Sequence, residues 1–166
     1  MATIRAKAIL PKKLNDQEIM AELAGEMKAV SKEVVADFQA TTRTWNNKPG
    51  FKNEFQQGAR QLRFLVSTDS DIYGYVSKGT KAHKILPKRA RVLAFRGGYK
   101  AKTSPGVIGS SGGGATGGEV FSRGVNHPGT KARNFDKEIA SKWEKPFGTR
   151  MQKAVSRGAK KSGHAI

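Results

Sequence analysis

The sequence predicts an α+β domain in which a small, largely antiparallel sheet carries a long N-terminal helix and a C-terminal helix on one face. Three patterns support this prediction: a helical apolar stripe near the start, short extended runs in the middle, and a second helical stripe near the end. The 166 residues suit a single domain, 1–166, which can bury a core without disulfides or a structural metal.

The first helix is predicted over residues 15–45. Asn15 can cap it, Leu14 can pack on Ile19 across the first turn, and Asn46, Asn47, Pro49 and Gly50 end it. The apolar stripe, at spacings of three and four with one longer gap, comprises Ile19, Leu23, Met27, Val30, Val34, Phe38 and Trp45. The acidic residues lie on other faces and are expected to be solvated: Glu18, Glu22, Glu26, Glu33 and Asp37.

Residues 61–125 are predicted to form the sheet. Leu62, Phe64 and Val66 alternate with Arg63 and Ser67, as in a half-buried strand. Further extended runs are predicted after a turn at 69–71, namely 72–76, 91–95 and 119–125.

Residues 97–118 interrupt this region with a low-complexity segment in which nine of 22 residues are glycine. Such a composition predicts a flexible loop without an apolar anchor. We expect a long hairpin excursion between two paired strands, ordered only against a neighbouring chain.

The C-terminal helix is predicted over residues 135–157, with Asn134 as its cap. Its apolar residues recur every four positions: Phe135, Ile139, Trp143, Phe147, Met151 and Val155. Pro146 is expected either to kink this helix or to begin a second one. The basic tail, 158–166, is expected to be frayed together with the last residues before it.

The net charge of +18 arises from 31 Lys and Arg against 13 Asp and Glu, and it is uneven: +3 over residues 1–60, +6 over 61–96 and +9 over 97–166. It indicates an acidic partner, such as nucleic acid, an anionic membrane surface or an acidic protein. The chain has no cysteine, which excludes disulfides and Cys-based zinc sites. No apolar run reaches the roughly 20 residues that span a bilayer.

The sequence contains no recognisable catalytic, cofactor or metal site. The glycine-rich segment lacks a GxxxxGK[ST] run, and there is no GxSxG motif. The three histidines, His83, His127 and His164, are not spaced as metal ligands, and Asp69 and Asp71 are typical of a turn. We therefore expect a non-enzymatic protein without cofactor or metal.

Basic residues cluster in the second half of the chain, where few aromatic residues are interleaved. The pattern fits contact with phosphates without base readout, or contact with an acidic protein. The candidates for facing a partner or DNA are Lys78, Lys81, Lys84, Lys88, Arg89, Lys100, Lys102, Arg123, Lys131 and Arg133.

One ordered set of short motifs is more specific than any of these features. The segments YVSKGT (75–80), ILPK (85–88), VLAF (92–95), VNHPGT (125–130) and NF (134–135) follow one another. Over roughly residues 15–155 the chain resembles the small tail-completion or head–tail joining proteins of long-tailed bacteriophages. It departs from their pattern at Ser77, where Glu is usual, at Asn134, where Pro is frequent, and in the length of 97–118.

The resemblance implies a structural virion protein at the tail–neck region, assembled in the host cytoplasm. It would form a homo-oligomeric, hexameric ring around the DNA path, contacting a stopper or connector, a tail terminator or the tail tube, and packaged dsDNA without sequence preference, but no membrane. The motif residues expected to shape the scaffold are Gly79, Pro87, His127, Pro128, Gly129 and Phe135. Of these, Gly79 and Gly129 are expected to allow tight reversals between strands, and His127 to order the turn at Pro128. The alternative is a free-standing basic domain that binds nucleic acid, which differs in a steep salt dependence of DNA affinity.

Overall fold

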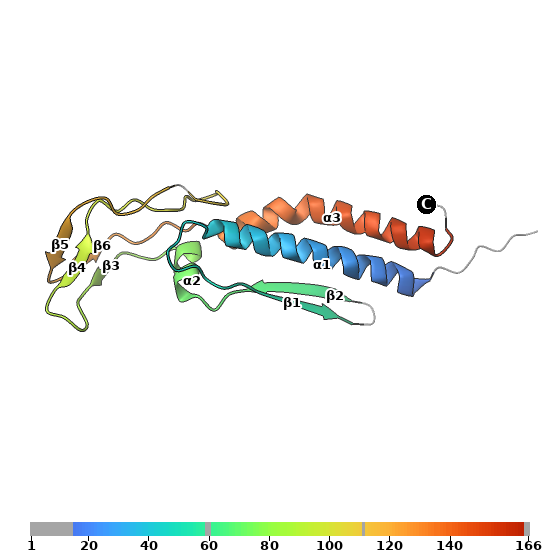
Figure 1. Ribbon diagram of the computed structural model, residues 1–166, viewed down its shortest axis with the longest axis horizontal. Coiled ribbons are helices and arrows are strands. Elements are labelled where there is room, and N and C mark those ends of the chain that lie inside the picture. Colours follow the sequence, from blue (N-terminus) through green and yellow to red (C-terminus); the bar gives the residue numbers. More distant parts are fainter. Residues whose placement is uncertain (1–14, 59–60, 111, 165–166) are drawn as a thin grey trace, which may run out of the picture.

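The computed structural model describes residues 15–58, 61–110 and 112–164. It has an α+β fold, as predicted, with three helices and small antiparallel sheets. The elements in chain order are α1 (Asp16–Thr41), β1 (Lys52–Gln57), β2 (Leu62–Ser67), α2 (Asp71–Lys78), β3 (His83–Ile85), β4 (Leu93–Arg96), β5 (Glu119–Ser122), β6 (Val125–His127) and α3 (Phe135–Lys161). The molecule is elongated, with α1 and α3 at one end and β3–β6 at the other (Figure 1).

Helices α1 and α3 lie side by side and run in opposite directions (Figure 1). Asn15 caps α1 as predicted, because its side chain accepts a hydrogen bond from the Gln17 N–H at 3.0 Å. The helix ends at Thr41 rather than near Trp45. The Thr41 and Thr42 hydroxyls donate to the carbonyls of Phe38 and Gln39, which favours closing the last turn over extending it. The expected contact of Leu14 lies outside the described residues.

The hydrophobic core joins the helix pair to the β1–β2 hairpin, which lies along α1 (Figure 1). Its buried centre consists of Val30, Val34 and Ile139. Phe64 and Val66 of β2 pack against this centre, so the alternation predicted for that strand is confirmed. The residues that complete the core are Phe38, Ile108, Trp143, Phe147 and Met151.

The single predicted sheet is instead three two-stranded sheets, and the predicted strand at 72–76 is wrong, because these residues belong to helix α2. Ser70 caps α2 by accepting from the Tyr73 N–H at 3.3 Å, and Gly79 ends it. Tyr73 and Ser77 are buried four residues apart, a spacing that places them on one face of a helix and not of a strand. The predicted turn at 69–71 therefore leads directly into α2, which begins at Asp71.

Strands β3–β6 form one long antiparallel ribbon. β3 pairs with β6, and β4, which follows β3 in the chain, pairs with β5, which precedes β6. A bridge between Thr80 and Thr130 extends the pairing toward the helices, and a bridge between Lys100 and Gly114 extends it into the excursion. Residues 86–92 form a side loop on one strand of this ribbon. We call residues 80–130 the nested ribbon. It forms the end of the molecule remote from the free ends of α1 and α3 (Figure 1).

The predicted hairpin excursion between paired strands is confirmed for 97–118, but the expectation that it lacks an apolar anchor is wrong. Ile108 packs against the core of the helix pair, and Thr103 is buried. The Lys102 ammonium also donates to the Thr44 carbonyl at 3.2 Å. The excursion therefore folds back onto its own chain.

Helix α3 is longer than predicted and continues through Pro146 to Lys161. Asn134 precedes it, but its side chain makes no capping hydrogen bond. The expectation of a frayed tail is wrong for residues 158–164, because Gly158, Ala159 and Ser162 are buried against α1. A Cβ at Gly158 would lie 2.6 Å from the Ile19 Cα, so glycine allows the two helices to approach closely.

Candidate interaction surface

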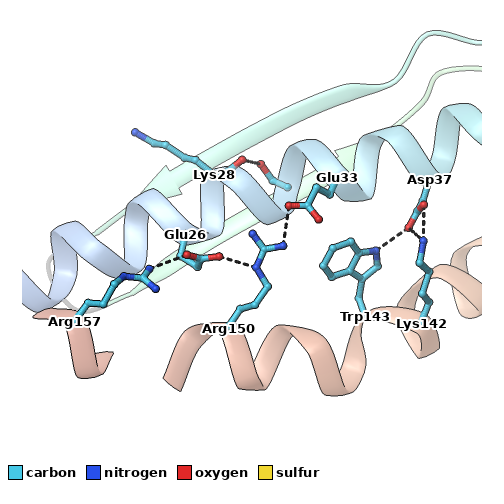
Figure 2. Close-up of polar contacts among 9 residues, drawn as sticks. Glu26, Lys28, Glu33, Asp37, Lys142, Trp143, Arg150 and Arg157 are labelled. Carbon is cyan, nitrogen blue, oxygen red and sulfur yellow. Dashed lines mark hydrogen bonds and ion pairs between the residues drawn. The ribbon is translucent and has the colours of Figure 1, made fainter. Parts of the chain in front are cut away.

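A ladder of ion pairs joins α1 to α3, and it corrects the expectation of solvated carboxylates for Glu22, Glu26 and Asp37, whereas Glu33 remains exposed. Arg150 donates to Glu26 at 2.6 Å and to Glu33 at 2.7 Å (Figure 2). Arg157 continues the ladder to Glu26 at 2.7 Å and to Glu22 at 2.8 Å. The hydrogen bonds from these arginines hold the pKa of the Glu22 and Glu26 carboxyls below the usual value.

The ladder extends to the other end of the helix pair. Asp37 accepts from the Lys142 ammonium at 2.7 Å and from the Trp143 indole N–H at 2.8 Å (Figure 2). Two sequence signals could have revealed this arrangement. Acidic residues 22, 26, 33 and 37 and basic residues 150, 157 and 161 both recur at steps of four and seven, which keeps each set on one helix face.

The distribution of charge between the two ends of the molecule follows from this ladder. Four acidic residues of α1 pair with cations of α3, namely Glu22, Glu26, Glu33 and Asp37. Residues 78–133, in contrast, carry twelve basic side chains and one acidic one, Glu119. Among the described residues of that segment, no ion pair forms. The positive charge of the nested ribbon is therefore uncompensated within the chain.

The ten basic candidates do not form one site. Eight are exposed: Lys78 at the end of α2, Lys81, Lys84, Lys88, Arg89, Lys100, Arg123 and Lys131. Six of these lie on the nested ribbon, and Lys131 follows it directly. Lys102 is half-buried and holds the ribbon's end to α1, while Arg133 is buried at the ribbon's base.

The six motif residues shape the base and side of the ribbon, with one correction. Gly79 does not join two strands, because it terminates α2 with φ at 78°. Gly129 has φ at 88°, and its N–H donates to the His127 Nδ1 at 3.0 Å, so His127 orders the turn at Pro128 as expected. Pro87 lies in the side loop after β3, and Phe135 is fully buried at the start of α3, against Tyr73.

The nested ribbon also exposes large apolar side chains, which the sequence reasoning missed. Of the described residues from 80 to 132, only Thr103 is buried. The exposed apolar residues of the ribbon are Ile85, Leu86, Val92, Phe95, Tyr99, Val107, Val120 and Phe121. Phe121 is 64% exposed and Leu86 is 56% exposed. An extended, charged surface with apolar residues of this size is typical of a contact with another chain.

Within residues 15–58, 61–110 and 112–164, no group of three or more acidic or histidine side chains is placed to hold a metal ion. His83 and His127 stack across β3 and β6, with ring centroids 5.0 Å apart. Burial raises the pKa of Tyr73 to about 12, so its hydroxyl stays protonated near neutral pH and serves packing beside Thr41. None of the helices in this part of the chain is long and apolar enough to cross a bilayer.

No family model matches the chain, and the comparisons with curated proteins and with solved structures also return no match.

Proposed function

We propose that the protein is a structural component of a long-tailed bacteriophage, which forms a ring at the head-proximal end of the tail. In this proposal the ring completes the tail and joins it to the head connector around the DNA path. The ordered motif set described above suggests this role, and the shape and surface of the nested ribbon support an assembling protein.

The observation that carries the proposal is the exposure of large apolar side chains on β3–β6 and the side loop of the nested ribbon, away from its returning excursion. An isolated two-stranded ribbon is marginally stable in water, and one covered by a helix, as β1–β2 is, gains the missing burial. In the nested ribbon, Leu86, Phe95 and Phe121 remain exposed. A second copy of the chain would cover them, so a ring of subunits supplies what the single chain lacks.

The charge of the ribbon agrees with such a ring. The nested ribbon carries nine basic side chains against one acidic side chain, so the ribbons of two neighbouring subunits would repel each other. The helix pair has nearly equal numbers of basic and acidic side chains. If one ribbon packs against the helix pair of the next subunit, the repulsion is avoided and the contact repeats head to tail. A repeating heterologous contact of this kind forms a ring when the rotation between neighbouring subunits closes, and an open filament when it does not.

The test is the assembly state of the purified protein, measured by sedimentation velocity and by negative-stain electron microscopy. We expect closed rings, and we expect the double variant Leu86→Ser, Phe121→Ser to sediment as a monomer. Leu65→Ser is the matched control, because it removes an exposed apolar side chain from β2, outside both the ribbon and the helix pair. A wild-type protein that stays monomeric at all concentrations, with or without dsDNA, would refute the proposal.

The ribbon's charge favours a second candidate, a free-standing domain that binds dsDNA. Neutralising several phosphates makes the affinity fall about 10³-fold or more between 50 and 200 mM salt. A monomer that shows this steep dependence in a filter-binding assay would favour the second candidate. A ring that binds DNA weakly at all salt concentrations would favour the first.

A further inference from the structure

A cleft of about 470 Å³ lies where the nested ribbon meets the helices. Its lining comes from four separate segments: the chain after α1, helix α2, the returning excursion, and the base of the ribbon. The lining includes Trp45, Asn46, Tyr99, Lys102, His127 and Arg133. Because the cleft joins segments that are distant in the sequence, it exists only in the folded chain.

Arg133 is the unusual member of this lining. It is 7% exposed, and its Nε is buried without a hydrogen-bond partner. Its backbone N–H bonds to the carbonyls of Val76 and Ser77, which fixes the residue at the end of α2. Within the described residues its guanidinium forms no ion pair. An arginine that is largely buried and has no counter-charge is unfavourable, so an anion that pairs with its guanidinium would be stabilised.

Two further residues of the cleft, Lys102 and His127, also supply hydrogen-bond donors. The Lys102 ammonium donates to the Thr44 carbonyl and to the Asn46 Oδ1, both at 3.2 Å, and both acceptors are neutral. His127 accepts from the Gly129 N–H at its Nδ1, which leaves the proton of the neutral ring on Nε2 as a donor. No Asp or Glu is among the residues that line the cleft. The described lining thus supplies positive charge and donors without a carboxylate.

The walls of the cleft are largely carbon. Trp45 and Tyr99 contribute aromatic rings, and Ile72 and Val76 of α2 contribute branched side chains. A ligand that fits has one anionic end and an apolar body.

We propose that this cleft binds a carboxylate of a partner protein, presented by an acidic residue in a peptide segment with an apolar neighbour. The guanidinium of Arg133 pairs with the carboxylate, and the apolar neighbour packs between Trp45 and Ile72. A planar carboxylate matches the fork of an arginine. A phosphate of duplex DNA fits less well, because the hydrophilic sugars that flank it would leave the apolar walls uncovered. The proposed binding of a carboxylate in this cleft does not depend on whether the chain assembles as a ring.

The test is an NMR titration of the ¹⁵N-labelled full chain with N-acetyl-Leu-Glu-amide, and with N-acetyl-Leu-Gln-amide as the neutral counterpart. We expect the acidic peptide alone to shift the Arg133 Nε–H and the Trp45 indole N–H. The Trp143 indole N–H, which is bonded to Asp37 on the helix pair, is the internal control and should not move. Inorganic phosphate, titrated separately, should shift the same signals less at equal concentration.

Two variants sharpen the test. Arg133→Gln should weaken binding of the acidic peptide at least tenfold, whereas Lys131→Gln removes the same charge from an exposed position and should change it less than twofold. An unchanged Trp143 signal shows that each variant is folded. Equal shifts with both peptides, stronger binding of phosphate, or full binding by Arg133→Gln would each overturn the proposal. If Arg133→Gln does not fold, the test is the comparison of the two peptides on the wild-type chain: shifts with the acidic peptide alone support the proposal, and equal shifts overturn it.

Discussion

The helix pair and the nested ribbon differ in how far they bury their apolar side chains and neutralise their charges. Between α1 and α3, apolar residues are buried and each carboxylate of the ladder pairs with a cation of α3 (Figure 2). In the ribbon, apolar residues are exposed and the cations have no carboxylate within the described chain. The helix pair thus provides burial and ion pairing within the chain, whereas the ribbon exposes apolar and basic side chains that another molecule can cover. We infer that stability is concentrated in the helix pair and interaction in the ribbon.

The largest expected difference between the two regions comes from removing one phenylalanine from each. Phe135→Ala should lower the free energy of unfolding by about 3–5 kcal/mol, because the ring is fully buried beside Tyr73. Phe121→Ala, the matched change in the ribbon, should alter it by less than about 0.5 kcal/mol in the monomer. Urea denaturation followed by circular dichroism measures both. Equal losses would show that the ribbon has a core of its own.

A smaller effect is expected from the closest approach of the two helices. Gly158→Ala should cost about 1–3 kcal/mol, because the added methyl group meets the Ile19 backbone at 2.6 Å. Gly148→Ala on the same helix meets nothing within 4 Å, and it should be neutral or stabilise by up to about 1 kcal/mol. The melting temperatures of the two variants should therefore shift in opposite directions. A stable Gly158→Ala would mean that the helices can move apart.

The smallest effect concerns the ladder and depends on pH. The pKa values of Glu22 and Glu26 are lowered in the folded state, so their stabilisation is present above the unfolded value of about 4.5 and is lost as the pH falls through the folded values. Arg150→Gln should cost about 1 kcal/mol at neutral pH. It should also flatten the dependence of stability on pH below 4.5.

Denaturant midpoints measured between pH 3 and pH 7 give this slope. Lys153→Gln is the control, because Lys153 is an exposed cation of the same helix that makes no ion pair within the described residues. An identical pH profile for Arg150→Gln and the wild-type chain would show that the ladder contributes nothing to stability.

Prediction from the sequence succeeded where a pattern is long and local. The stripe that contains Val30 and Val34 placed α1, and the one that contains Ile139 and Phe147 placed α3, since many residues repeat the same spacing. It failed at 72–76, where five residues are too few to separate a helix from a strand. The cap at Ser70 and the spacing of Tyr73 and Ser77 were the available signals.

The surface was predicted only in part. The basic candidates are mostly exposed, as the sequence suggested, but Arg133 is buried and Lys102 is a tether. Their environments depend on Thr44 and Val76, which lie far from them along the chain. Residue type and spacing carry no information about such contacts.

The sequence by itself determined the two long helices, the capping of α1, the paired strands around 97–118 and the excess of positive charge, because each depends on neighbours along the chain or on composition. Only the tertiary structure decided which charges are neutralised, where the excursion returns, and that Arg133 lines a cleft. These features depend on distances between remote segments, and those distances are fixed when the core around Val30, Val34 and Ile139 closes.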